Sequence, residues 1–383
     1  MTAGRPGVLF VLPNFAGGGA ERVALTLLAG LDRSRFLPQL VVFDATGPLQ
    51  SLLAEDVDLQ RLDRPKLRHA LPKLLGHIRR SRPAVVFASQ GYLNLALLAS
   101  RALMPRGTRL ALRESNTPSQ SLPNRRHPRL MTWGYRRFYR HADLLFCQHR
   151  QTEQELQQDF GVAGGRIVSL PNPVPVARLR DSAAAPSRRP GGGPRFVAAG
   201  RLHRQKGFDR LIRVFARMPA DAELSIYGEG EEQAALTALI RELGLETRVD
   251  LAGYSTNLPA ALAGADACLI PSRWEGLPNV ALEALACGTA VIATPESGGI
   301  AELAEAAPPG TVALASLTED AGAPFLQAMQ RIAVRPPEGP GPSLLPPRYE
   351  LEAVLAQWNA ALHRLTAAPA VVDRPASPLK RRS

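Results

Sequence analysis

The sequence has 383 residues with 46 Lys and Arg against 34 Asp and Glu, a net charge of +12. With 45% hydrophobic residues, this length excludes a disordered chain and predicts two globular domains. Three widely spaced cysteines exclude a disulfide framework, and no apolar stretch approaches the roughly twenty residues of a membrane-spanning helix, so we expect a cytoplasmic protein that is neither exported nor integral.

Short apolar runs alternate with amphipathic stretches along the first half of the chain. The run from Val8 to Leu12 is too short for a signal-peptide core and is typical of a first β-strand. Helical periodicity follows over residues 20–31, where Val23 and Leu27 share one face. Strands are predicted at 8–13, 38–44, 84–89, 109–114 and 144–148.

The alternation stops at residues 180–194, RDSAAAPSRRPGGGP, and then restarts. Helices are predicted at 208–217 and 231–243. Alternating βα units predict parallel sheets, here in two doubly wound, Rossmann-like α/β domains whose facing strand ends form a cleft for substrate. The second set of strands is 195–201, 223–228, 248–253, 267–272 and 290–294. The expected divisions are a first domain at 1–178, a linker at 179–194, a second domain at 195–347, a helix crossing back to the first domain at 348–366 and a disordered tail at 367–383.

The excess of positive over negative charge lies entirely in the first half of the chain. Residues 1–185 hold 26 Lys and Arg against 13 Asp and Glu, whereas the remainder holds 20 against 21. This asymmetry predicts an anionic partner for the first domain. No nucleic-acid-binding module is visible, so we expect no nucleic acid partner.

Two basic stretches suggest what that anionic partner is. Residues 64–83 carry Leu71 and Leu74 on a basic helix, and residues 124–143 interleave Trp133 with arginines. Both suit an interfacial helix on the anionic surface of the inner membrane. An ordinary domain helix, with its apolar side in the core and a solvated basic side, fits equally well, and the sequence leaves both interpretations open.

The segment 272–294, SRWEGLPNVALEALACGTAVIAT, carries two acids at a strand-to-helix turn. Pro278 suits the first helical position and Gly288 the stop beyond the last. A diphosphate at the helix N-terminus, a sugar near Glu275 and a ribose bound by Glu283 would explain both acids. The alternative is a turn acid and a solvated helix residue.

Further candidates lie at other predicted strand ends. Arg201 and Lys206 flank a loop in AGRLHRQKGFDRLI, where two cations can clamp a diphosphate leaving group, although solvated loop cations are common. Gly228 in YGEGEE would let the backbone approach a nucleotide, and the loop at Tyr254 could touch a base.

The segment 14–23, NFAGGGAERV, invites a dinucleotide-binding interpretation, strengthened by Asp44 at the next strand end. Arg22 stands where the G-x-G-x-x-G fingerprint needs its last glycine, so that fingerprint fails. A glycine turn that admits a substrate phosphate or sugar to the helix N-terminus fits equally well.

Together, GGGAER, GRLHRQKGFDRLI, YGEGEE and SRWEGLPNVALEALACGTAVIAT resemble the retaining glycosyltransferases of family 4, which have the GT-B fold. The resemblance implies a nucleotide-diphosphate sugar held mainly by the second domain, retention at the anomeric carbon, and neither metal nor cofactor. It implies that Arg201 and Lys206 neutralise the diphosphate while Glu275 approaches the donor sugar. The donor-binding residues it implies are Gly18, Gly19, Gly228, Tyr254, Gly276, Leu277, Pro278, Asn279 and Glu283.

One departure from that family concerns the first domain. Many relatives carry a His at a strand end that here reads RESNTP, residues 113–118. Arg113, Glu114 and Asn116 are the candidates for its work, as in a branch with a Ser-Glu-Arg-Asn sequence. The expected catalytic residues are therefore Glu275, Arg201, Lys206 and Glu114.

The resulting expectation is an enzyme that moves a hexose or N-acetylhexosamine to a lipid-linked or polysaccharide acceptor in cell-surface glycan synthesis. A nucleotide-sugar epimerase of the same architecture is the alternative, since only a transferase needs an acceptor for donor turnover. An NAD-dependent oxidoreductase and a nucleic-acid-binding protein are disfavoured by the broken fingerprint and by the missing module.

Overall fold

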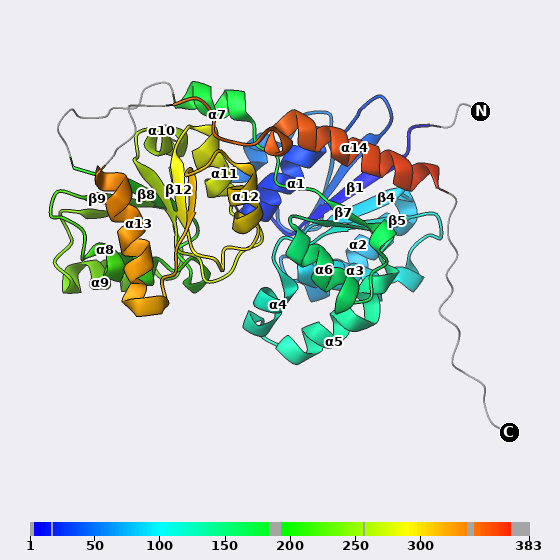
Figure 1. Ribbon diagram of the computed structural model, residues 1–383. Coiled ribbons are helices and arrows are strands. Elements are labelled where there is room, and N and C mark those ends of the chain that lie inside the picture. Colours follow the sequence, from blue (N-terminus) through cyan, green and yellow to red (C-terminus); the bar gives the residue numbers. More distant parts are fainter. Residues whose placement is uncertain (1–3, 17, 184–192, 256, 335–340, 369–383) are drawn as a thin grey trace.

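The computed structural model describes residues 4–16, 18–183, 193–255, 257–334 and 341–368, and it shows two α/β domains side by side (Figure 1). Most of the linker expected at 179–194 and of the tail expected at 367–383 lies outside the described residues. The two Rossmann-like parallel sheets confirm the fold class expected from the sequence.

The first domain is built on a seven-stranded parallel sheet of order β3-β2-β1-β4-β5-β6-β7. In β1, Leu9 and Val11 enter one buried cluster while Val8 and Phe10 enter another, so helices cover both faces. The strands are β1 (Gly7–Leu12), β2 (Leu37–Val42), β3 (Asp58–Arg61), β4 (Val85–Ala88), β5 (Arg109–Arg113), β6 (Leu144–Cys147) and β7 (Ile167–Ser169). The helices are α1 (Gly19–Ala29), α2 (Leu67–Ser81), α3 (Gly91–Ala99), α4 (Pro118–Ser121), α5 (Pro128–Phe138) and α6 (Arg150–Gln158).

The second domain has a six-stranded parallel sheet of order β10-β9-β8-β11-β12-β13. Alternate residues of β8 again divide between two cores, with Phe196 in one and Val197 in the other. The strands are β8 (Arg195–Ala199), β9 (Glu223–Tyr227), β10 (Val249–Gly253), β11 (Ala267–Ile270), β12 (Ala290–Ala293) and β13 (Val312–Leu314). The helices are α7 (Val176–Ser182), α8 (Phe208–Phe215), α9 (Gln233–Glu242), α10 (Leu258–Ala263), α11 (Asn279–Ala286), α12 (Ile300–Ala306) and α13 (Ala323–Val334).

The last helix, α14 (Leu351–Ala367), follows the second domain in sequence but packs on the first (Figure 1). Trp358 is fully buried, with its ring centroid 5.0 Å from those of Phe87 and Phe146. Asn359 accepts a hydrogen bond from the backbone N–H of Asp32 at 2.9 Å. The chain therefore passes twice between the domains, and this crossing completes the core of the first.

The basic helix α2 turns its apolar side into the core. Leu74 is fully buried and Leu71 is partly buried against the same cluster. Of the two interpretations left open for residues 64–83, the structure fits the ordinary domain helix, because Leu71 and Leu74 pack against the core of the first domain. Helix α5 differs, since Leu130 and Trp133 remain 62% and 58% exposed.

Candidate active site

The carboxyl ends of the central strands of both sheets meet between the domains. After β5, the Thr117 hydroxyl donates to the carbonyl of Glu275, which follows β11, at 3.4 Å. The Gln205 amide donates to Asn116 Oδ1 at 3.4 Å. A Cβ on Gly276 would lie 2.3 Å from the carbonyl oxygen of Ser115, so glycine is the residue that fits this approach. This is the edge at which ligands bind in open parallel sheets.

Lys206 and Glu275 form an ion pair at this edge. Glu275 is 8% exposed, and its carboxylate accepts from Lys206 Nζ and, at 3.0 Å, from the Ser272 hydroxyl. The Lys206 stem lies against Gly200, where a Cβ would stand 2.9 Å from Lys206 Cε. The structure therefore joins two of the four expected catalytic residues in one low-exposure pair.

The two loops that carry this pair are fastened to each other by residues that sequence reasoning missed. Arg273 makes two hydrogen bonds of 2.7 Å to the Asp209 carboxylate and one of 2.8 Å to the carbonyl of Arg204. Arg210 donates to the carbonyls of Pro271 and Ser272 at 2.8 and 2.6 Å. The sequence alone does not indicate these partners, because Arg273 and Arg210 are two of many arginines and no local pattern distinguishes them.

Helix α11 begins at the turn where the sequence predicts an anion-binding end, with one correction to its first residue. Pro278 is the N-cap with extended backbone angles, so the helix begins at Asn279, one residue later than predicted. Gly288 has φ +83° immediately beyond the C-cap, as a helix stop requires. The Ala281 N–H donates to the carbonyl of Pro278 at 3.1 Å, which leaves the N–H groups of Asn279 and Val280 without an intrahelical acceptor. They follow Leu277, whose carbonyl accepts from Asn172 of the first domain.

Glu283 lies one turn further along α11 and is partly buried. Burial raises the pKa of its carboxyl, and the charge of Arg22 on the facing domain partly opposes this. Within the described residues, its carboxylate has no hydrogen-bond or ion-pair partner. A carboxylate that lacks a protein partner has its acceptor capacity available for a ligand.

The remaining donor-binding candidates surround these groups without joining the Lys206–Glu275 pair. Gly18 is the N-cap of α1, and the carbonyl of Gly19 lies 3.5 Å from the Asn279 amide. Gly228 has φ +136°, and a Cβ there would lie 2.0 Å from the carbonyl oxygen of Gly200. Tyr254 is 51% exposed beyond β10.

Arg201, the fourth residue expected at the catalytic centre, is exposed on the loop after β8. Its side chain makes no hydrogen bond or ion pair with another residue in the described ranges. The structure therefore does not bring Arg201 to the Lys206–Glu275 pair, although its guanidinium stands free on the same loop.

Glu114, also expected at the catalytic centre, is buried in the first domain. The carboxylate is 3% exposed and accepts hydrogen bonds from Tyr135, Tyr139 and, at 3.1 Å, Asn94. Burial raises its pKa, while these donors lower it. Protein groups therefore enclose this side chain inside the first domain and keep it apart from the Lys206–Glu275 pair, and its catalytic role stays a prediction.

A histidine that the sequence did not single out lies close to the Glu275 turn. His149 is 2% exposed, and its Nε2 lies 3.2 Å from Thr117 Oγ1 and 3.0 Å from Thr152 Oγ1. Burial lowers the pKa of His149 to about 4. Its neutral ring is packed against Gly299 of the second domain, where a Cβ would lie 3.2 Å away.

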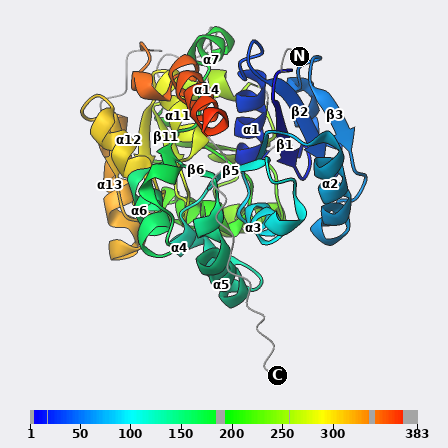
Figure 2. The same cartoon turned by 90° about the vertical axis from the view of Figure 1, so that its right-hand side faces the viewer.

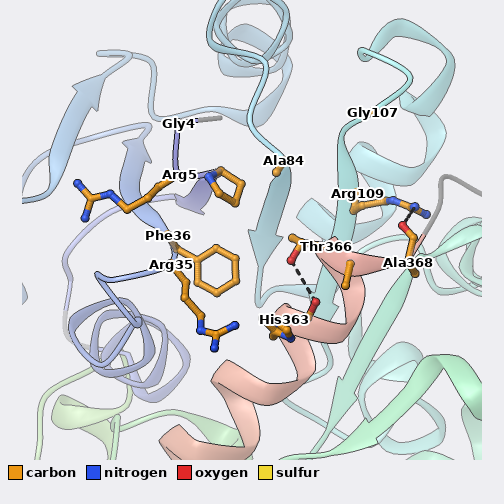
Figure 3. A pocket seen from close by; sticks show the side chains of 12 residues that line it. Gly4, Arg5, Arg35, Phe36, Ala84, Gly107, Arg109, His363, Thr366 and Ala368 are labelled. Atoms are coloured by element: carbon orange, nitrogen blue, oxygen red, sulfur yellow. Dashed lines mark hydrogen bonds between the residues drawn. The ribbon is translucent and has the colours of Figure 1, made fainter. Parts of the chain in front are cut away.

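A separate hollow of about 570 Å³ lies at the amino ends of the first-domain strands (Figure 3). Arg5, Arg35 and Arg109 line it, but their guanidinium groups point in different directions (Figure 3). Arg109 is engaged with the carbonyl of Ala368 at 3.0 Å. The hollow is at the opposite edge of the sheet from Glu275 and does not belong to this site.

Two negative findings concern the described part of the chain. No group of three or more His, Cys, Asp and Glu side chains there is arranged to hold a metal ion. No helix there has the length and apolar character needed to cross a membrane.

The sequence matches two families, Glycosyl transferases group 1 over residues 180–330 and Glycosyl transferase 4-like domain over residues 18–173. Among solved structures, Anabaena HepE in complex with UDP and glucose superposes with a TM-score of 0.69 at 20% identity, covering 94% of this chain and 100% of the other. Sucrose-phosphate synthase from Thermosynechococcus elongatus gives 0.78 at 20% identity, covering 95% and 100%. The family matches and the fold thus define a glycosyltransferase with the GT-B fold.

Two relatives narrow the class. One is the N-acetylgalactosamine-N,N'-diacetylbacillosaminyl-diphospho-undecaprenol 4-alpha-N-acetylgalactosaminyltransferase of Campylobacter jejuni, 29% identical over 76% of this chain and 81% of its own length. Another is the lipopolysaccharide core biosynthesis glycosyltransferase LpsE of Rhizobium meliloti, 38% identical over 42% of this chain and 46% of its own length. The chain belongs to glycosyltransferase family 4.

Proposed function

We propose that this glycosyltransferase moves a hexose or N-acetylhexosamine from a nucleotide-diphosphate sugar to a lipid-linked or polysaccharide acceptor, with retention and without a metal. The observation that carries the proposal is the Lys206–Glu275 pair beside the N-terminus of α11, with the unpartnered Glu283 carboxylate one turn further on. These groups match the three parts of such a donor: sugar, diphosphate and ribose.

The diphosphate is the part that gains charge as the glycosidic bond breaks. The Lys206 ammonium and the first N–H groups of α11 are positioned to stabilise that charge without any metal. Arg201, exposed on the same loop, would add a second cation once a ligand draws it in. The acceptor oxygen replaces the diphosphate oxygen on the anomeric carbon, and its proton leaves with the diphosphate.

Glu275 and Glu283 are the groups proposed to orient the donor. Glu275 is held by Ser272 and Lys206, so its carboxylate has a fixed direction towards the sugar. Glu283 would accept hydrogen bonds from the ribose hydroxyls, since it has an available carboxylate among apolar neighbours. Neither role requires Glu114, which is enclosed.

We propose the acceptor from the names of two relatives, and the cellular location from the exposed apolar and basic residues of α5. The Campylobacter jejuni enzyme is named for a diphospho-undecaprenol-linked acceptor, and LpsE for lipopolysaccharide core biosynthesis. Exposed Leu130 and Trp133 stand among arginines on α5, which suits the anionic cytoplasmic face of an inner membrane. We therefore propose cell-surface glycan synthesis at that surface.

A panel of nucleotide sugars tests the proposal through the release of nucleotide diphosphate, with and without a lipid extract. We expect release to depend on the acceptor, the product to keep the anomeric configuration of the donor by NMR, and EDTA to change the rate less than about twofold. A strict Mg²⁺ requirement or an inverted product would contradict it. Donor turnover without any acceptor would favour the epimerase instead.

A further inference from the structure

Arg113, the last residue of β5, is a buried cation that feels the charge of the adjacent Glu114 but makes no ion pair with it. Its side chain is fully buried and forms no ion pair with any residue in the described ranges. Its Nε has no hydrogen-bond partner there, and its other contacts are to Asn172 and, at 3.4 Å, the Ser115 hydroxyl. Burial lowers the pKa of Arg113 to about 10, so the guanidinium remains charged at neutral pH. An unpaired buried charge is costly to folding, which calls for a reason beyond packing.

The guanidinium fixes the orientation of a neighbouring amide. It carries only donors, so the Asn172 oxygen must face it and the Asn172 NH2 group must face away. That NH2 group reaches the second domain, where it donates to the carbonyl of Leu277 at 3.0 Å and to Asn279 Oδ1. Asn172 is 4% exposed, so water does not compete for these bonds.

The same logic carries to the next amide. Because Asn279 Oδ1 accepts from Asn172, the Asn279 NH2 group points the other way, 3.5 Å from the carbonyl of Gly19. Each hydrogen bond of this series is therefore donated in the same direction. Arg113 donates to Asn172, Asn172 to Asn279 of the predicted donor-binding turn, and Asn279 to Gly19 of the first domain. An ionised carboxylate at the start carries only acceptors and would impose the opposite direction.

We propose that Arg113 and Asn172 are positioning residues that hold the two domains closed over the donor, by fixing the direction of the Asn279 amide in the Gly276–Asn279 turn. The proposal rests on the proposed function of that turn as the donor-binding element. In this role the buried charge fixes the position of one domain relative to the other, which is the kind of specificity that buried charges are best known to provide.

Asn172→Asp separates positioning from packing. The carboxylate keeps the size of the amide and pairs with Arg113, but it turns an acceptor towards the carbonyl of Leu277 and reverses the Asn279 amide. We expect a similar Tm, because the new ion pair with Arg113 offsets the repulsion from the Leu277 carbonyl, and a kcat about tenfold lower together with a higher donor KM, the scale of a lost buried hydrogen bond. In small-angle scattering with UDP, the radius of gyration should exceed that of the wild type, because the domains open.

Arg113→Met provides a second variant, since it removes the charge at similar volume and frees the Asn172 amide to rotate. It should match the kcat loss of Asn172→Asp without loss of stability. Thr108→Val is the matched control, because the buried Thr108 hydroxyl donates to the carbonyl of Pro83 at 2.9 Å at the opposite edge of the same sheet. That variant should lose stability and keep the wild-type kcat.

The proposed positioning role of Arg113 and Asn172 is overturned if Asn172→Asp folds and keeps both the kcat and the scattering curve of the wild type. It is also overturned if Thr108→Val loses kcat to the same degree. Scattering of the ligand-free proteins tests it without any turnover. A wild type that releases no nucleotide diphosphate from any donor would refute the proposed function. The difference in radius of gyration between the ligand-free wild type and the variants would still test the positioning role of Arg113 and Asn172.

Discussion

At the scale of single residues, the partly buried Glu283 carboxylate faces no protein donor in the described ranges and is raised in pKa by burial. Replacing it by Gln keeps the shape and removes the charged acceptor. We expect the affinity for a nucleotide diphosphate to fall by about 1.5–3 kcal/mol, the range for hydrogen bonds to charged groups. Isothermal titration calorimetry measures this, and an unchanged Kd would refute the ribose-binding role.

His149 makes the stability of the protein depend on pH. Burial lowers its folded pKa from 6.5 to about 4, so the unfolded chain binds a proton first as the pH falls. Its contribution is therefore complete above pH 6.5 and is lost progressively down to about pH 4. The difference corresponds to about 3 kcal/mol.

The variant His149→Gln tests this contribution, because it retains a group that can bond Thr117 and Thr152 and does not titrate. Urea unfolding between pH 4 and pH 7 should show a shallower loss of stability for the variant than for the wild type. Parallel profiles would show that His149 does not supply the pH dependence.

Two of the predicted site residues, Lys206 and Glu275, lie close together because each of them follows a strand. Lys206 and Glu275 follow β8 and β11, which are neighbours in the sheet, so parallel pairing brings their loops together. Glu114 also follows a strand, but Tyr135 of α5 and Tyr139, the residue after the end of α5, enclose it. No local pattern in the sequence shows that a distant helix will cover a strand end.

At the scale of elements, the predicted strands include every inner strand of both sheets and one edge strand, β10. Those that the sequence did not reveal, β3, β7 and β13, are all at sheet edges. Edge strands bury less surface, and three of the four residues of β3 are exposed. β3 reads DLQR and lacks the apolar run by which the inner strands are recognised. β7 (IVS) and β13 (VAL) are apolar, but at three residues each they are too short to show a strand pattern.

The loops that carry Lys206 and Glu275 depend on the Asp209–Arg273 pair between α8 and the turn after β11. Arg273→Lys keeps the charge but cannot make both 2.7 Å bonds to the carboxylate. The Asp209 side chain is 40% exposed, so solvent screens the pair, and we expect a loss of about 1 kcal/mol, or about fivefold in kcat.

Nucleotide diphosphate affinity should change little in Arg273→Lys, because the ligand groups on α11 are untouched. Exchanging the two residues, Asp209→Arg with Arg273→Asp, should recover part of the lost kcat. Equal losses in the single variants and in the exchange would show that the pair does not fasten the loops.

At the scale of the whole molecule, the domains meet through two kinds of contact. Arg150 on α6 reaches Glu305 on α12 at 3.0 Å, but both side chains are about two-thirds exposed. Such a pair is weak and is screened by salt. The Asn172 amide is 4% exposed, so its bonds to Leu277 and Asn279 are better shielded from water and salt, and they define the closed arrangement more firmly than the exposed charges do.

The excess positive charge of the first half gathers in part on an α5 surface, which comprises exposed Leu130 and Trp133 and the exposed arginines 125, 126, 129, 136, 137 and 140. This surface lies at one end of the first domain, on a different side from α2 (Figures 1 and 2). An apolar pair ringed by arginines suits an anionic leaflet, and the attraction falls off within about 8 Å at physiological salt.

Trp133→Ser combined with Arg136→Glu and Arg137→Glu should therefore reduce co-sedimentation with phosphatidylglycerol vesicles about tenfold or more at low salt. The matched control is Arg68→Glu with Arg80→Glu on α2, which changes the charge equally and should retain binding, because the apolar side of α2 is in the core. Neutral vesicles should bind neither protein well, and nucleotide diphosphate affinity should be unchanged throughout. If both sets release the protein alike, net charge alone drives binding and α5 is no specific docking surface. If the wild type ignores anionic vesicles at low salt, the basic first domain instead meets an anionic acceptor glycan.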